Sequence, residues 1–131
     1  MDHKTFLIYV HIVKMTDVTI PIRAVSVNCY YKKFRNHIVI SKKGREMKIA
    51  IHEFLAENKV PQILGKVKVQ MVFCLKYKRK IDVDNLLKGT IDSIKDIMIE
   101  DDDMIYDLSV QKLIGEPADS IRIIITPLEA T

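Results

Sequence analysis

Hydrophobic and polar residues alternate most regularly over residues 66–78, KVKVQMVFCLKYK. Hydrophobic side chains occupy residues 67, 69, 71, 73 and 75, and lysine or glutamine occupies most of the positions between them. A period of two residues is typical of a β-strand with one buried face. If the strand continued further, Lys76, Lys78, Lys80 and Asp82 would lie on one face.

The period becomes helical from about Asp84. Leu87, Ile91, Ile94 and Met98 recur at steps of four, three and four residues. This spacing predicts a helix of roughly 15 residues that buries one hydrophobic stripe.

A second helix is predicted in the segment SKKGREMKIAIHEFLAENK, which begins at Ser41. Serine is a favoured residue at the N-cap position, although Gly44 weakens the first turn. Asn58 and Pro61 end the helix. The hydrophobic residues expected on its buried face are Met47, Ile51, Phe54 and Leu55.

Further strands are predicted over residues 5–13, 104–113 and 121–126, because these segments are rich in β-branched and aromatic residues. Residues 16–40 are expected to form loops and short strands in VTIPI, SVNCYY and HIVI. The chain has 131 residues, the usual size of one domain. The fold class is therefore expected to be α+β, with one domain over residues 1–131, a mixed β-sheet and two main helices.

The composition points to a cytoplasmic protein. No hydrophobic run approaches the roughly 18 residues that span a membrane. The N-terminus has no cationic leader and no small-residue cleavage site, so a strand is expected there rather than a signal peptide. Cys29 and Cys74 do not form a close-spaced pair. A reduced protein of the cytoplasm, without a membrane partner, is the expectation.

Charge is distributed unevenly along the chain. Residues 1–80 contain 17 Lys and Arg but only 5 Asp and Glu, whereas residues 81–131 contain 4 and 12. The basic part favours an anionic partner, with nucleic acid the leading candidate. The acidic part would repel such a partner unless a cation lay between them.

Acidic residues occur at both ends of the helix predicted from Asp84. Asp84, Lys88 and Asp92 are spaced four residues apart and share one side of it, and Asp82 precedes it. Residues 100–103, EDDD, follow it, where the helix dipole disfavours negative charge. An N-cap role for Asp84 and a solvated acidic turn are the ordinary explanations. A site for Mg²⁺, which prefers carboxylate oxygens, is the alternative, and it requires the chain to bring the two groups together.

Aromatic and basic residues also lie together near residue 30. Tyr30 and Tyr31 are followed by Lys32, Lys33 and Arg35. The tyrosines would stack on exposed bases if they were accessible, and packing within the protein is the alternative explanation.

The segments DVDNLLKGTIDSI and EDDDMIYDLSVQK resemble the RusA family of Holliday junction resolvases, the crossover junction endodeoxyribonucleases. The family pattern is Asp-x-Asp-Asn-x-x-Lys, then an acidic pair before the next strand. SVNCYY is also similar to the family's N-terminal stretch, and the resemblance covers roughly residues 20–127. It departs from the pattern at Asp103, in an additional strand-like segment at residues 1–19, and in a reduced proline-rich start.

The resemblance implies that Asp82, Asp84 and Asp102 are catalytic aspartates that bind metal and that Lys88 is an essential lysine. Asp101 or Asp103 would replace Asp102 if the alignment of the loop shifts by one residue. The implied cofactor is Mg²⁺, for which Mn²⁺ can substitute because it also accepts oxygen ligands. The residues expected to contact DNA are Lys76, Lys78, Arg79, Lys80, Asn28, Tyr30, Lys32 and Lys33.

The function implied by the resemblance is Mg²⁺-dependent resolution of four-way DNA junctions during recombination and repair. Paired cuts on a two-fold symmetric junction imply a homodimer. Two alternatives stay open: a nuclease that acts on flaps or forks, and a non-catalytic protein that binds branched DNA.

Overall fold

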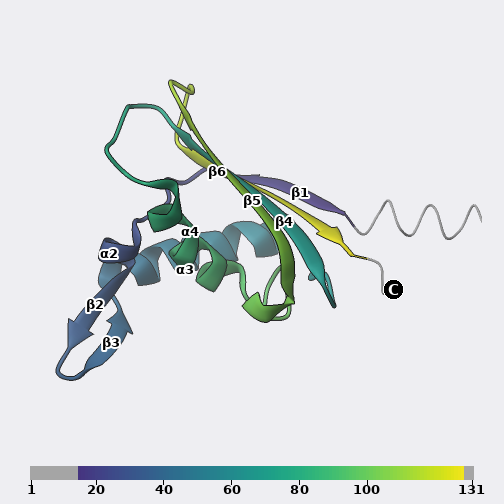
Figure 1. Ribbon diagram of the computed structural model, residues 1–131, viewed down its shortest axis with the longest axis horizontal. Helices are drawn as coiled ribbons and strands as arrows, with labels where there is room; N and C mark the ends of the chain where they lie inside the picture. The colour runs from purple at the N-terminus through teal and green to yellow at the C-terminus, as the bar shows by residue number, and fades with distance from the viewer. Residues whose placement is uncertain (1–14, 129–131) are drawn as a thin grey trace, which may run out of the picture.

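The strand with the clearest alternation, β4 (Val67–Leu75), lies inside a four-stranded mixed sheet of order β1-β6-β4-β5 (Figure 1). The computed structural model describes residues 15–128. β6 (Ser120–Pro127) pairs antiparallel with both β4 and β1 (Thr16–Ile20), and β5 (Ile105–Ile114) pairs parallel with β4. The helices cover one face of this sheet. The α+β class and the mixed sheet are confirmed.

β4 buries the side chains of all five alternate positions that the sequence indicated. The strand ends at Leu75, so its expected continuation to residue 78 is wrong. The backbone N–H of Lys76 donates a hydrogen bond to the Asp119 side chain at 2.8 Å, and the carbonyl of Leu75 accepts from Gly115 at 3.0 Å. These bonds take the chain out of the sheet, and residues 76–82 form a loop.

The helix α3 (Lys42–Glu57) begins and ends as predicted. The Ser41 hydroxyl accepts a hydrogen bond from the backbone N–H of Gly44 at 3.0 Å, and Asn58 is the C-cap residue. Gly44 was expected only to weaken the first turn, but the packing requires it. A Cβ atom at residue 44 would lie 2.3 Å from the Tyr30 carbonyl oxygen and 2.8 Å from Ile40 Cγ2.

Substitution of Gly44 by alanine is therefore expected to lower the free energy of unfolding by about 1–3 kcal/mol, although alanine has the higher helix propensity. The neighbouring atom is backbone, which cannot rotate out of the way. Urea denaturation of Gly44→Ala and of Lys42→Ala, an exposed position in the same turn, measures the difference. An unfolding midpoint for Gly44→Ala at or above that of the parent protein would contradict this packing.

The helix α4 (Val83–Ile94) has 12 residues, and its buried face overlaps the predicted one only in part: Ile94 is buried, and Leu87 and Ile91 pack partly buried against the core. Its buried residues are Leu86, Gly89, Thr90, Ser93 and Ile94. Thr90 and Ser93 donate their hydroxyl hydrogen bonds to backbone carbonyls one turn earlier, so these polar residues are buried without an unpaired hydroxyl. Leu87 and Ile91 are partly exposed, and Met98 is buried in the turn after the helix. The hydrophobic pattern alone did not reveal this rotation.

The segment between β1 and α3 contains a short helix, α2 (Val27–Tyr30), and a hairpin of β2 (Tyr31–Phe34) and β3 (His37–Ile40). SVNCYY was expected as a short strand, but four of these residues form the helix α2, and β2 begins only at Tyr31. The strand predicted over residues 5–13 lies outside the described residues. Among residues 15–128, no helix is both long and hydrophobic enough to cross a membrane.

Candidate active site

α4 and β5 line a groove with a volume of about 430 Å³. α4 contributes Asp84, Lys88 and Asp92, and the spacing of four residues places them on the side that faces the groove. Asp102 lines it from the short 3₁₀ turn η1 (Asp102–Met104), which precedes β5. The other lining residues are Leu87, Ile91, Ile105, Tyr106, Asp107 and Leu108. Three of the four predicted catalytic residues therefore share one groove, and Asp82 is not among its lining residues.

The parallel pairing of β4 and β5 separates the two acidic groups. Val67 lies opposite Ile105 at one end of the pair and Leu75 opposite Ile114 at the other. Asp82 follows the C-terminal end of β4, whereas Asp102 precedes the N-terminal end of β5. The 12-residue α4 connects these ends over about 18 Å.

One Mg²⁺ ion joins several acids only where their carboxylate oxygens converge, because Mg²⁺–oxygen distances are about 2.1 Å. Within residues 15–128, no group of three His, Cys, Asp or Glu side chains is arranged to hold one metal ion. The chain brings Asp84 and Asp102 to one groove, but a single copy does not close the two acidic groups around one ion. The ligand assignments stay predictions.

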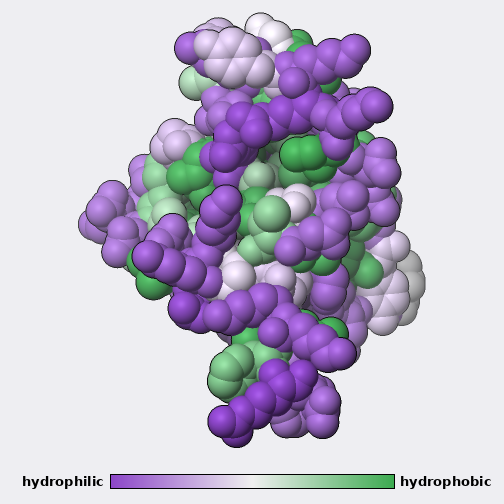
Figure 2. Space-filling model, turned by 90° about the vertical axis from the view of Figure 1, so that its left-hand side faces the viewer, coloured by the Kyte–Doolittle hydropathy of each residue, from purple (hydrophilic) through white to green (hydrophobic). Residues whose placement is uncertain are grey.

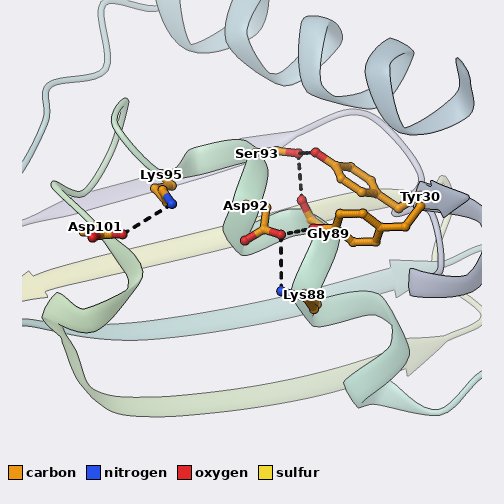
Figure 3. A network of polar contacts seen from close by, with 8 residues as sticks. Tyr30, Lys88, Gly89, Asp92, Ser93, Lys95 and Asp101 are labelled. Carbon is orange, nitrogen blue, oxygen red and sulfur yellow. Dashed lines mark hydrogen bonds and ion pairs between the residues drawn. The ribbon is translucent and has the colours of Figure 1, made fainter. Parts of the chain in front are cut away.

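Asp92 is a residue of the groove that the sequence placed on the correct helix face but did not identify as functional. Its carboxylate accepts a hydrogen bond from the Tyr31 hydroxyl and lies 3.5 Å from the Lys88 ammonium nitrogen (Figure 3). The same ammonium nitrogen lies 5.7 Å from the centre of the Tyr31 ring. Burial raises the pKa of Asp92, and the charge of Asp102 raises it further, against the opposing effect of Lys95. Asp92 and Tyr31 therefore lie next to the Lys88 ammonium group at the groove, and the Lys88 side chain is 62% exposed.

The three aspartates of the acidic loop, residues 101–103, differ in their contacts. The Asp101 side chain accepts a hydrogen bond from the backbone N–H of Asp102 at 2.8 Å and forms an ion pair with Lys95 at 3.5 Å. Hydrogen bonding with Asp102 is the main cause of the lowered pKa of Asp101. Asp101 therefore caps η1, and Asp102 is the member of the three that lines the groove. This geometry favours Asp102 over Asp101 and Asp103 as the groove carboxylate.

Most of the residues predicted to contact DNA are exposed. Lys76, Lys78 and Lys80 lie in the loop after β4, Lys32 and Lys33 lie on the hairpin, and Asn28 lies on α2. The prediction that Tyr30 contacts DNA is wrong, because its side chain is fully buried. Its hydroxyl forms a hydrogen bond with Ser93 at 2.9 Å, and its ring fills the space over Gly89 (Figure 3). A residue buried in this way cannot stack on a base, and packing within the protein explains Tyr30.

A second hollow of about 200 Å³ gathers three basic residues, Arg23, Lys43 and Arg79. The Nε atom of Arg79 is buried and has no hydrogen-bond partner among the described residues. Ile81, which also lines the hollow, is the residue before Asp82. Spacing did not predict this convergence, because Arg23 and Lys43 are distant from Arg79 in the sequence.

Comparison with known proteins identifies relatives of this chain. The family described as endodeoxyribonuclease RusA matches residues 21–126. A curated relative, the crossover junction endodeoxyribonuclease RusA of Enterobacteria phage HK97, is 26% identical over 107 residues. That alignment covers 80% of this chain and 89% of the relative. The family match begins directly after β1 and contains α4, the acidic loop and β5.

Proposed function

The chain belongs to the RusA family of endodeoxyribonucleases, and from this premise we propose that it resolves Holliday junctions by Mg²⁺-dependent hydrolysis of phosphodiester bonds, as a homodimer, in DNA recombination and repair. The observation that carries the proposal is the groove in which Asp84, Lys88 and Asp102 lie together. Four aspartates and one lysine line the groove, so a polyanionic substrate would need a cation between its phosphates and the carboxylates.

The carboxylates in and beside the groove would hold Mg²⁺ in groups of one or two. Proteins commonly hold this ion with one or two carboxylates and leave its other positions to water and substrate phosphate. Asp82 and Asp84 form one such pair at the start of α4, and Asp102 is the candidate at the other end of the groove. When bound, the ion supplies an activated water and a charge that binds the scissile phosphate.

Lys88 is the protein side chain that contributes positive charge to this groove, in addition to the charge of the bound ion. Its ammonium group would stabilise the negative charge that develops on the phosphate oxygens in the transition state. Asp92 and Tyr31 orient it, so that less conformational freedom is lost when DNA binds. The basic loop residues 76–80 and the basic hollow around Arg79 would hold the flanking phosphates, with an affinity that falls steeply as salt rises.

A homodimer accounts for the separation of the acidic groups. If two copies pack around a two-fold axis across the groove, the Asp82–Asp84 end of one copy lies beside the acidic loop of the other. Each of the two centres then combines Asp82 and Asp84 with Asp102 of the partner subunit. β5 supports this arrangement, because it leaves four large hydrophobic residues exposed: Tyr106, Leu108, Leu113 and Ile114. Two centres related by a two-fold axis also match the symmetry of a four-way junction.

The proposed function is tested with synthetic DNA of equal length and different shape. With Mg²⁺, the protein is expected to make paired, symmetric cuts in a four-way junction and to leave linear duplex uncut; EDTA should abolish cutting. Preferential cutting of flaps or forks would identify a nuclease with another target. Binding to junctions without cutting in Mg²⁺ or Mn²⁺ would identify a non-catalytic DNA-binding protein.

Replacement of Asp92 by asparagine is expected to reduce the rate of junction cutting by about ten- to a hundredfold at saturating protein, because Lys88 loses its anchor. The affinity for the junction should stay equal or become tighter, because one negative charge near the phosphates is removed. Single-turnover cleavage and a binding titration separate the two effects, and Tyr31→Phe should give a smaller loss in the same direction. Asp96→Asn, an exposed position four residues further on, is the matched control. Equal rates for Asp92→Asn and Asp96→Asn would remove the positioning role.

A further inference from the structure

The hairpin of β2 and β3 projects away from the sheet beyond α2 and α3 (Figure 1). It is strongly basic: Lys32, Lys33 and Arg35 lie within four residues, and the chain has no acidic residue between Asp17 and Glu46. Arg35 adopts a left-handed backbone conformation with φ 57° at the turn. Positive charge is therefore concentrated on this two-stranded hairpin.

The end of this hairpin also carries exposed hydrophobic side chains. Phe34 is 55% exposed and Ile38 is 79% exposed, and neither belongs to the core. The guanidinium carbon of Arg35 lies 5.4 Å from the centre of the Phe34 ring. Figure 2 shows the lower projection of the molecule as mostly hydrophilic residues beside a hydrophobic one. The exposed Phe34 ring, beside an arginine and two lysines, is accessible for stacking on a base.

The base of the hairpin is part of the candidate active site. Tyr31, the first residue of β2, donates a hydrogen bond to Asp92 and lies below the Lys88 ammonium group. Phe34 is three residues further along the strand, which is about 10 Å. That distance corresponds to about three base steps along one DNA strand. The tip is therefore placed to contact DNA close to the groove.

We propose that Phe34 inserts between bases at the branch point of a DNA junction while the basic residues of the hairpin hold the adjacent phosphates. This inference rests on the proposed function and identifies the part of the chain that distinguishes a junction from a duplex. Insertion of a hydrophobic side chain separates neighbouring bases, and this costs least where stacking is already interrupted. Every base offers a face on which an aromatic ring stacks, so insertion needs no particular sequence.

The size and charge of the surface favour DNA over a protein partner. Two hydrophobic side chains are far fewer than the roughly 20 residues that each protein contributes to a stable interface. The surrounding charges are all positive, which suits phosphates on both sides of a separated base step.

The test compares Phe34→Ala with Ile49→Ala, a matched control that is 56% exposed on the outer side of α3. Both changes are made in the Asp82→Asn background so that the DNA stays intact in Mg²⁺. The probes are a four-way junction with 2-aminopurine at the point of exchange and a linear duplex of the same sequence. Fluorescence reports unstacking, and titrations give the two affinities.

The control is expected to raise the fluorescence on the junction, and Phe34→Ala is expected to lose that rise. Phe34→Ala should also bind the junction about five- to a hundredfold more weakly, while its duplex affinity stays unchanged. Lys32→Ala should instead weaken both affinities. If Phe34→Ala retains the fluorescence rise and the junction preference, the inference is wrong while the proposed function stands. If Phe34→Ala changes the oligomeric mass in sedimentation, the tip contacts a second copy and the inference is also wrong. A parent protein with no junction preference overturns the proposed function itself.

Discussion

Replacement of Asp82 by asparagine is expected to reduce Mg²⁺-dependent cutting of a four-way junction by about a thousandfold or more, because a metal-binding carboxylate contributes several kcal/mol to transition-state stabilisation. The fold should be retained. Asp82 is the N-cap residue of α4, but its side chain makes no capping hydrogen bond, and asparagine is equally favoured at this position. Binding should be equal or tighter, because one negative charge near the phosphates is removed.

The measurement is single-turnover cleavage of a labelled junction, with a titration of the same junction to measure affinity. Asp96→Asn controls for the loss of one carboxylate charge, because Asp96 is exposed and lies outside the groove. If Asp82→Asn cuts as fast as Asp96→Asn, Asp82 is not a catalytic ligand. If Asp82→Asn fails to bind the junction, its loss of activity does not test metal binding. Asp84→Asn is then compared with Asp96→Asn instead.

Replacement of Lys88 by alanine is expected to lower the cutting rate at saturating protein by about a hundred- to a thousandfold. Its ammonium group lies in the groove beside Asp92, and no other basic residue among the described residues 15–128 lines the groove. Lys88→Arg should recover part of the rate, since it restores the charge with a different shape. Junction affinity should fall only slightly, because the loop of residues 76–80 and the hairpin of β2 and β3 are expected to provide most of the basic residues that contact phosphates.

The effect on the rate constant, measured against the effect on affinity, decides the role of Lys88. A catalytic lysine changes the rate, whereas a lysine that only attracts DNA changes the affinity and the salt dependence. Equal rates for Lys88→Ala and the parent protein at saturating concentration would show that the groove does not perform the chemistry.

Local patterns predicted the elements whose interactions are local. Alternation identified β4, and the serine cap with a hydrophobic face identified α3. The buried face of α4 was predicted only in part, because Thr90 and Ser93 satisfy their hydroxyls within the helix and because Gly89 admits the ring of Tyr30. The burial of Tyr30 depends on contacts between segments about sixty residues apart, which no local pattern reports.

The candidate site was also predicted only in part. The spacing of Asp84, Lys88 and Asp92 along one helix established that they share a face, and the structure places that face on the groove. The distance from Asp82 to Asp102 depends on the parallel register of β4 and β5, which is set by the sheet as a whole. The register places these acids at opposite ends of α4, and this separation is what makes a second copy necessary in our account.

The most direct test of that account combines two inactive variants in one dimer. Asp82→Asn and Asp102→Asn are co-expressed with different affinity tags, and mixed dimers are isolated by purification on both tags. Each variant alone is expected to be inactive. If each centre combines Asp82 of one copy with Asp102 of its partner, the mixed dimer has one doubly altered centre and one intact centre, and it should nick one strand of a four-way junction in Mg²⁺. A mixed dimer that leaves both strands uncut would contradict the shared centre.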